Sequence, residues 1–211
     1  VVAGLCHDIG HGPFSHVFDG EFIPRARGCA FTHETMSKRM IEFMVDDNHI
    51  DIEGDELRFV QDLIHPEFDS PSLASRPQFM FEIVANERNS IDVDKFDYMA
   101  RDTYNLGLKS TFDFSRLMSL SRVIDDEICF HSKDVYTVYE LFHHRYKLFK
   151  SIYTHRAAKA IEYMITDALL EADVVWDRRI SSTIDSPEQY MHLTDGILRE
   201  IEACRDPAMA K

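Results

Sequence analysis

Histidine and aspartate side chains crowd the beginning of the chain, in the stretch LCHDIGHGPFSHVFDG. His7 and Asp8 are adjacent, and His11, His16 and Asp19 follow shortly after them. An imidazole nitrogen and a carboxylate oxygen are ligands that suit a borderline or hard divalent cation. Two adjacent ligands do not complete a metal site, so this pair predicts that further ligands come from elsewhere in the chain.

A second group of polar residues lies in IDVDKFDYMARD, which holds four aspartates within eleven residues. On a helix, Asp94, Asp97 and Tyr98 share one face, because residues three and four apart are neighbours. Two interpretations are open for this segment. It is either a solvated acidic face or a functional surface that combines carboxylate, ammonium, phenol and guanidinium groups.

A basic segment, HHRYKLFKSIYTHRAAKA, covers residues 143–160 and contains five Lys or Arg and no acidic residue. Arg145, Phe149, Tyr153 and Arg156 recur at a spacing that places them on one face of a helix. This face is either solvated and balanced by acidic neighbours, or it is a phosphate clamp. The clamp is chemically reasonable because Arg supplies a bidentate fork and Lys a point charge.

The elements that must position these groups are mostly helical, because apolar residues recur with helical spacing. The pattern predicts helices over 32–47, 54–64, 79–104, 134–172 and 186–204. Thr32 or Thr35 could cap the first of them, and Ser186 with Pro187 could begin the last. Three prolines and three serines predict a loop over 65–78. Residues 122–134 are the best candidate for a strand pair, with Asp125 and Asp126 at the turn.

Composition limits the function classes. With 211 residues and 45% hydrophobic content, the chain can form one sizeable core, and we find no clear domain boundary. The net charge of −14 argues against binding a polyanion through overall charge. The sequence has no signal peptide, and no apolar run reaches the ~18 residues of a membrane span. We interpret the four cysteines as free thiols in a reducing cell interior rather than two disulfides.

The segments LCHDIGHGPFSHVFDGEF, FTHE, IDVDKFDYMARD and FHHRYKLFKSIYTH occur in order. Together they resemble the HD-domain superfamily of metal-dependent phosphohydrolases, and more narrowly its SAM- and HD-domain deoxynucleoside triphosphate triphosphohydrolases. The resemblance implies a mostly α-helical HD-domain bundle with a minor β-hairpin. It covers 1–211 as one HD domain that is truncated at its N-terminus and its C-terminus. The upstream helix that carries the family's first metal-ligand histidine would lie before Val1.

The resemblance also implies roles for individual residues. His7, Asp8 and Asp94 match metal ligands for a divalent ion (Fe, Mn, Zn, Ni or Mg), and the catalytic positions match His11, His16, Asp19 and His33. The positions that bind the triphosphate and the sugar match Lys95, Tyr98, Asp102, Arg145 and Tyr153. Arg116 and Lys133 match contacts to an activating nucleotide, although His131 stands where relatives have an arginine. Phe149 stands where relatives have a histidine one turn after Arg145.

The expected activity is hydrolysis of dGTP and other deoxynucleoside triphosphates to the deoxynucleoside and inorganic triphosphate. Among the catalytic positions, we expect His16 to protonate the leaving 5′-oxygen, because an imidazole titrates near neutral pH. The expected partners are the dNTP substrate, an activating GTP or dNTP, and further copies of the chain in a homo-oligomer, in the nucleus or the cytoplasm. Nothing in the sequence indicates nucleic acid or membrane binding. The alternatives are an HD enzyme acting on another phosphate ester, and a non-catalytic module that senses nucleotides or binds nucleic acid.

Overall fold

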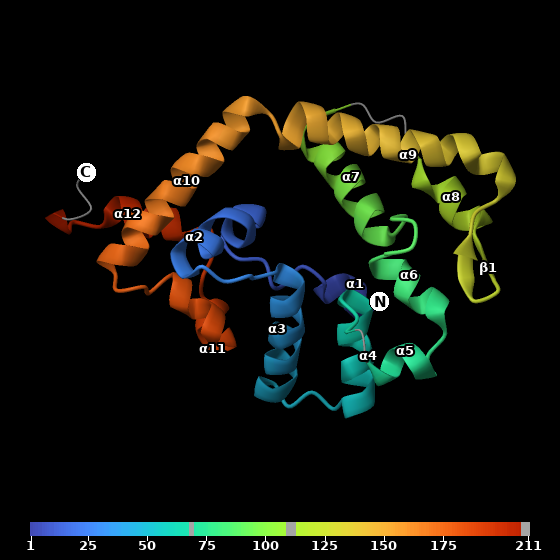
Figure 1. Ribbon diagram of the computed structural model, residues 1–211, viewed down its shortest axis with the longest axis horizontal. Helices are drawn as coiled ribbons and strands as arrows, with labels where there is room; N and C mark the ends of the chain where they lie inside the picture. Colours follow the sequence, from blue (N-terminus) through green and yellow to red (C-terminus); the bar gives the residue numbers. More distant parts are fainter. Residues whose placement is uncertain (68–69, 109–112, 208–211) are drawn as a thin grey trace. The chain divides into compact units, whose positions relative to one another are not determined.

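The computed structural model describes residues 1–67, 70–108 and 113–207. Within these ranges the chain forms twelve α-helices, several short 3-10 or π-helical segments and one two-stranded sheet (Figure 1). This confirms the prediction of a mostly helical fold with a minor β-hairpin. No helix within the same ranges is both long enough and apolar enough to cross a membrane.

The chain divides into two compact units. Unit 1 consists of Val1–Gly4 and Arg58–Ala158, and unit 2 consists of Leu5–Leu57 and Lys159–Lys211. Three helices cross the boundaries between these ranges: α1 (Val2–Cys6), α4 (Gly54–Ile64) and α10 (Arg156–Val175). The assignment of 1–211 to one HD domain stays a prediction.

Unit 1 packs helices around a core of Ile91, Met99, Leu117, Leu141 and Leu148. The helix α7 (Val93–Asn105) contacts α9 (Val135–Leu148), and in Figure 1 the two helices lie at an angle to each other. The other elements of this unit are α5 (Pro71–Ser75), η2 (Gln78–Met80), α6 (Phe81–Val84), α8 (Phe114–Leu120), η3 (Ser132–Asp134) and η4 (Phe149–Tyr153). This core therefore fixes α7 and α9, which carry the acidic and the basic segments.

The predicted hairpin is present in unit 1. Strand β1 (Arg122–Ile124) pairs antiparallel with β2 (Glu127–Cys129), with Val123 opposite Ile128. Both turn residues, Asp125 and Asp126, have positive φ, as a two-residue type I′ turn requires. The hairpin is attached to α6 through buried Glu82, which accepts the Ile128 N–H at 2.7 Å and binds the Arg88 guanidinium.

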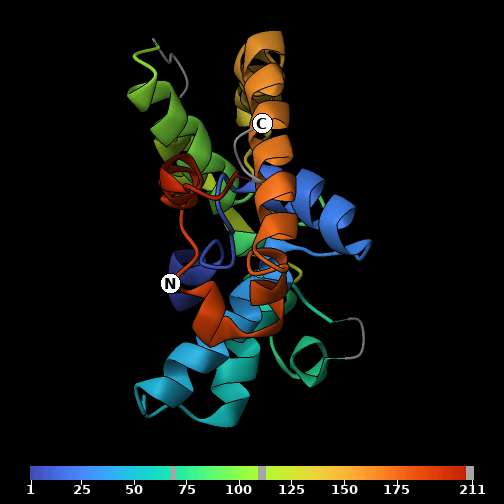
Figure 2. The same ribbon diagram turned by 90° about the vertical axis from the view of Figure 1, so that its left-hand side faces the viewer.

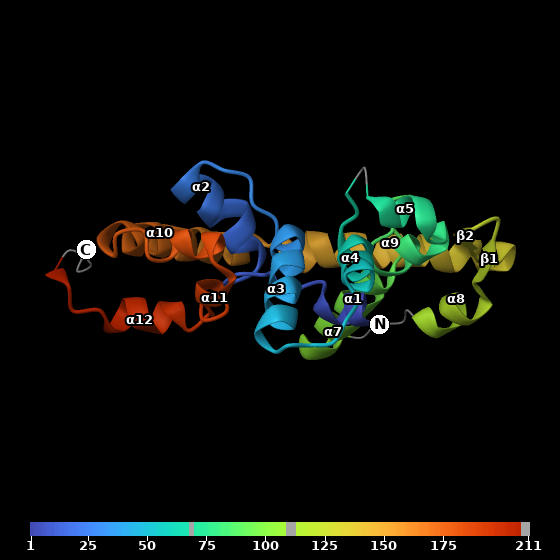
Figure 3. The ribbon, with the colours of Figure 1, turned by 90° about the horizontal axis from the view of Figure 1, so that it is seen from below.

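Unit 2 surrounds a second core, to which η1 (Phe18–Phe22), α2 (Ile23–Arg27), α3 (His33–Asp47), η5 (Ser181–Asp185), α11 (Pro187–Tyr190) and α12 (Ile197–Ala203) contribute. Figure 2 shows α10 as a straight rod, and Figure 3 shows α2 and α12 on opposite sides of it. Phe18 and Phe22 are fully buried against Leu169 of α10. Residues 7–17, which we call the histidine loop, contain His7, His11 and His16. The loop lies directly before η1, so this core determines its position.

Several predicted elements are interrupted. The helix predicted over 134–172 divides into α9, η4 and α10, because the Thr154 N–H and hydroxyl both bind the Phe149 carbonyl and end the ladder. The helix predicted over 79–104 is broken at 85–92, and the one over 186–204 is broken after Tyr190. The loop predicted over 65–78 contains α5, which Ser70 caps and Pro71 begins, a recognisable start signal; residues 68–69 lie outside the described ranges.

Candidate active site

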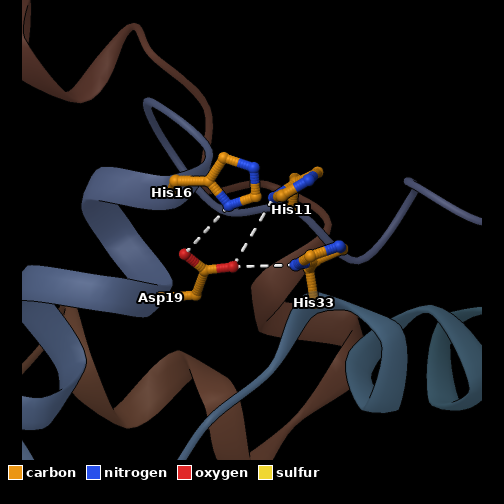
Figure 4. A group of neighbouring side chains, drawn as sticks. All are labelled: His11, His16, Asp19 and His33. Carbon is orange, nitrogen blue, oxygen red and sulfur yellow. Dashed lines mark hydrogen bonds and ion pairs between the residues drawn. The ribbon is translucent and has the colours of Figure 1, made fainter. Parts of the chain in front are cut away.

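Three histidines surround one carboxylate in unit 2 (Figure 4). Asp19 Oδ2 lies 2.8 Å from His33 Nδ1 and 3.9 Å from His11 Nδ1, and Asp19 Oδ1 lies 3.6 Å from His16 Nδ1. The His11 and His33 rings stack with centroids 3.8 Å apart, and the His16 ring stands edge-on 5.0 Å from that of His11. The four predicted catalytic residues thus lie together.

Local structure explains how these four side chains meet. His16 and Asp19 are three residues apart where the chain enters η1, so they lie on one face. His33 is the first residue of α3, and Thr32 caps that helix by accepting the Thr35 N–H, as predicted. His11 comes from the loop that follows α1.

The environments of the histidines push their pKa values apart. Burial, with the nearby charge of His33, lowers the pKa of His11 below its ordinary value. The Asp19 carboxylate raises the pKa of His16, outweighing the opposite effect of burial. For Asp19 itself, burial raises the pKa, but His16 and His33 together hold it well below its usual range. The two shifts run in opposite directions, so His16, whose side chain is 80% exposed, keeps its proton to higher pH than His11 does.

Two groups of donors have the chemistry of a metal site. His7 Nε2 lies 3.4 Å from Asp8 Oδ1, so an imidazole nitrogen and a carboxylate oxygen are already side by side, as a divalent cation requires. Asp8 also lies 3.7 Å from His11 Nε2. The third predicted ligand, Asp94, belongs to unit 1, and its place in this ligand set stays a prediction. In the second group, one ligand atom each of His11, His16, Asp19 and His33 lies within 4.8 Å of the others.

Glycine is needed in the loop for a reason of space. A Cβ on Gly10 would lie 2.2 Å from both the His33 carbonyl oxygen and the Ser37 nitrogen, which are backbone atoms of α3. A Cβ on Gly12 would overlap the Phe18 ring at 2.4 Å. The Gly10 N–H donates to Ser37 Oγ at 2.9 Å, and that hydroxyl donates to the His7 carbonyl at 2.5 Å. The loop therefore lies directly against α3.

Four of the predicted substrate-binding residues gather in unit 1. The Tyr153 hydroxyl donates to Asp102 Oδ2 at 2.5 Å, and the Tyr98 and Tyr153 rings meet edge to face. Burial raises the pKa of both tyrosines, and for Tyr153 the Asp102 carboxylate adds to the rise. Both phenols therefore stay neutral and able to donate hydrogen bonds.

Arg145 completes this group. Its guanidinium lies over the Phe149 ring, with Cζ 4.4 Å from the centroid, so Phe149 provides a cation–π contact. Arg145 Nε is buried and has no hydrogen-bond partner among the described residues. Arg156 does not continue this face, because it begins α10 beyond the break at Thr154. That part of the prediction is wrong.

The remaining predicted positions have partners of their own in unit 1. Lys95 Nζ lies 2.9 Å from the buried Asp92 carboxylate, which also caps α7. Exposed Asp97 pairs with Arg101, as a solvated helix face would. Arg116 donates to buried Asp134 at 2.7 Å, and Lys133 is exposed beside it.

Sequence reasoning missed the residues that hold the histidine loop in place. These are Ser37 of α3, Tyr190 of α11 and Asp195, which precedes α12. Tyr190 and Asp195 act from positions 180 and 181 residues along the chain. No spacing rule connects such distant positions, so only the folded structure identifies them.

Several curated proteins similar to this chain are named deoxynucleoside triphosphate triphosphohydrolases. A protein named deoxynucleoside triphosphate triphosphohydrolase SAMHD1 homolog, from Dictyostelium discoideum, is 46% identical over 211 residues, which are all of this chain and 40% of the relative. The human SAMHD1 enzyme is 41% identical over 238 residues, with 99% of this chain and 38% of the relative covered. A putative HD domain-containing protein, L394 of Acanthamoeba polyphaga mimivirus, is 36% identical over 211 residues. That match covers 95% of this chain and 42% of the relative.

The chain spans about two fifths of the length of the curated relatives it matches. No family model matches it.

Proposed function

Because the chain belongs to the HD-domain family of the SAMHD1-type deoxynucleoside triphosphate triphosphohydrolases, to which it is homologous over its full length, we propose that the protein containing it hydrolyses deoxynucleoside triphosphates. The products are the deoxynucleoside and inorganic triphosphate. The observation that carries this proposal is the convergence of His11, His16, Asp19 and His33 in unit 2. Such a group can supply the proton that a leaving 5′-oxygen needs.

The reaction is tested by its products. dGTP and a divalent metal are incubated with the full-length protein, and the products are separated by ion chromatography. The expected result is equal amounts of deoxyguanosine and inorganic triphosphate. Release of diphosphate or monophosphate alone would contradict the triphosphohydrolase and favour an HD enzyme of another specificity. No hydrolysis at all would favour the non-catalytic alternative.

In the proposed mechanism His7, Asp8 and Asp94 would hold a divalent metal, and that metal would supply a nucleophile by making water easier to deprotonate. His16 donates its proton to the 5′-oxygen as the bond to the α-phosphorus breaks. Asp19 raises the pKa of His16 and orients its ring, and His33 fixes Asp19 from the other side through their 2.8 Å contact. The neutral His11 stacks on His33 and completes the wall of the site.

The substrate-binding roles are proposed for the group in unit 1. Arg145 offers a buried Nε with no protein acceptor in the described ranges, which suits an anionic phosphate oxygen. Lys95, paired with Asp92 in this structure, is the second proposed phosphate contact. Tyr98 and Asp102 bind the sugar, with the Asp102 carboxylate accepting from the 3′-hydroxyl. Tyr153, held by Asp102, packs against C2′ and excludes a ribose 2′-hydroxyl.

Metal content gives a prediction that does not depend on activity. Asp94→Ala in the full-length protein is expected to abolish tightly bound divalent metal, because a carboxylate ligand is lost. Asp97→Ala is the matched control, since Asp97 lies on the same helix and its exposed carboxylate pairs with Arg101. Elemental analysis after gel filtration measures both variants. An Asp94→Ala protein that retains its metal would remove Asp94 from the ligand set.

We also propose a regulatory nucleotide site and a subunit contact. Arg116 and Lys133 bind an activating GTP or dNTP, which rate measurements against GTP concentration would test. The protein assembles as a homo-oligomer; α9 exposes Tyr136, Tyr139 and Tyr146 by 73%, 73% and 61%, an aromatic surface of the kind that subunit contacts cover. Analytical ultracentrifugation measures that state.

Four free cysteines favour a nuclear or cytoplasmic location, which microscopy of the tagged protein would decide.

A further inference from the structure

The loop that separates His11 from His16 has an unusual backbone. Phe14 and Ser15 have φ values of 60° and 50°, so two consecutive residues with side chains adopt the left-handed conformation. This conformation is uncommon for residues other than glycine, and for a bulky residue such as Phe it is strained. Two such residues in succession need contacts from the rest of the fold to hold them.

Contacts on both sides of His11 hold the loop. Before it, the Tyr190 hydroxyl donates to the Gly10 carbonyl at 2.8 Å inside the core, and the Gly10 N–H donates to Ser37 Oγ. After it, the Phe14 N–H donates to Asp195 Oδ1 at 2.9 Å. Asp195 binds one of the two strained residues, Phe14. Of the three contacts, this is the one with a charged acceptor.

Asp195 and His11 both line one pocket. The pocket has a volume of about 390 Å³ and lies between residues 11–13 of the loop and residues 193–196 before α12. The hydrogen bond from the Phe14 N–H lets the Asp195 carboxylate hold the backbone of the loop. Its effect on the histidine rings is therefore through the loop.

We propose that Asp195 is a positioning residue, which sets the relative placement of His11 and His16 by holding the Phe14 N–H. This inference rests on the proposed function, since it assigns those histidines to the reaction. Without the Asp195 acceptor, the strained Phe14–Ser15 turn loses its restraint and relaxes. The His16 imidazole then leaves the geometry in which Asp19 lies 3.6 Å from its Nδ1.

The test compares three variants of the full-length protein. Asp195→Ala removes the acceptor and is expected to lower kcat for dGTP roughly 10- to 100-fold, the range for losing one hydrogen bond to a charged group, with KM changed less than about threefold. Asp195→Asn keeps an oxygen acceptor at the same place and is expected to restore most of kcat. Glu188→Ala removes an exposed carboxylate on α11 and controls for loss of negative charge in this region.

Three results would overturn the proposal. They are an unchanged kcat in Asp195→Ala, an equal loss in Asp195→Ala and Asp195→Asn, and a loss accompanied by a lower thermal midpoint than in Glu188→Ala. The first would show that the contact is unnecessary, the second that charge matters rather than the hydrogen bond, and the third that the effect is on folding.

A second readout separates this proposal from the proposed function. In protein labelled at histidine, the ring protons of His11 and His16 should give a nuclear Overhauser effect, because their centroids are 5.0 Å apart. Asp195→Ala is expected to abolish this signal and Asp195→Asn to keep it, whether or not dGTP is hydrolysed. If the wild-type protein is inactive but the signal behaves in this way, the proposed function fails and the positioning role stands. A signal that persists in Asp195→Ala would refute the positioning role alone.

Discussion

Replacing His16 by alanine is expected to lower kcat for deoxynucleoside triphosphate hydrolysis by roughly 10²–10⁴-fold, the usual contribution of a general acid. The leaving 5′-oxygen is a poor leaving group unless it receives a proton as its bond to phosphorus breaks. His16 is suited to that role because its ring is exposed and Asp19 raises its pKa. KM should change much less than kcat, since the imidazole is needed mainly in the transition state.

The pH dependence gives the same prediction a second measurement. His16 must be protonated to act, so kcat falls as pH rises through the pKa of this histidine. The carboxylates of Asp19, Asp8 and Glu34 raise that pKa, while burial lowers it, and the His11 and His33 rings lie beside it. Asp19→Asn removes the largest of these effects and is expected to shift the alkaline limb of the kcat profile to lower pH.

His192→Ala is the matched control, because His192 is an exposed histidine on the same unit and outside the cluster. It should leave kcat and its pH profile unchanged. A His16→Ala protein with wild-type kcat would assign the proton donor to another group, and an unshifted profile in Asp19→Asn would separate Asp19 from the titration.

Replacing Gly10 by alanine is expected to destabilise the fold more than replacing any other glycine of this loop by alanine. Its Cβ would lie 2.2 Å from two backbone atoms of α3, and neither can move like a flexible side chain. The loop or the helix must shift, which costs about 3 kcal/mol, the upper end of the range for overpacking. The denaturant midpoint, followed by circular dichroism in the full-length protein, measures the loss.

Gly20→Ala is the control for this substitution. Gly20 lies in η1, has no positive φ, and an added Cβ would meet nothing within 4 Å. Its replacement should raise stability by up to about 1 kcal/mol, because alanine loses less backbone entropy in a helix. Equal midpoints for the two variants would show that the loop can move away from α3 without cost.

Helix starts and the hairpin turn could be predicted from the sequence, because their signals lie within a few neighbouring residues. Thr32 caps α3, Ser186 and Pro187 begin α11, and the Asp125–Asp126 turn joins the two strands, all as the sequence indicates. The continuous helix predicted through 134–172 fails because one side chain, that of Thr154, competes for the Phe149 carbonyl. Apolar periodicity continues through this point, so spacing alone does not reveal the break.

From the sequence alone, imidazoles and carboxylates in order and at matching spacing predict a metal-dependent phosphohydrolase and name the residues that could carry its chemistry. Of those residues, the structure brings His11, His16, Asp19 and His33 together. Only the tertiary structure decides the burial and the charged neighbours of each side chain. A pKa depends on burial and on neighbours that are distant in sequence, as for His11 and His16. Tyr190 and Asp195 bind the loop from positions 180 and 181 residues along the chain, and no local sequence pattern predicts contacts at that separation.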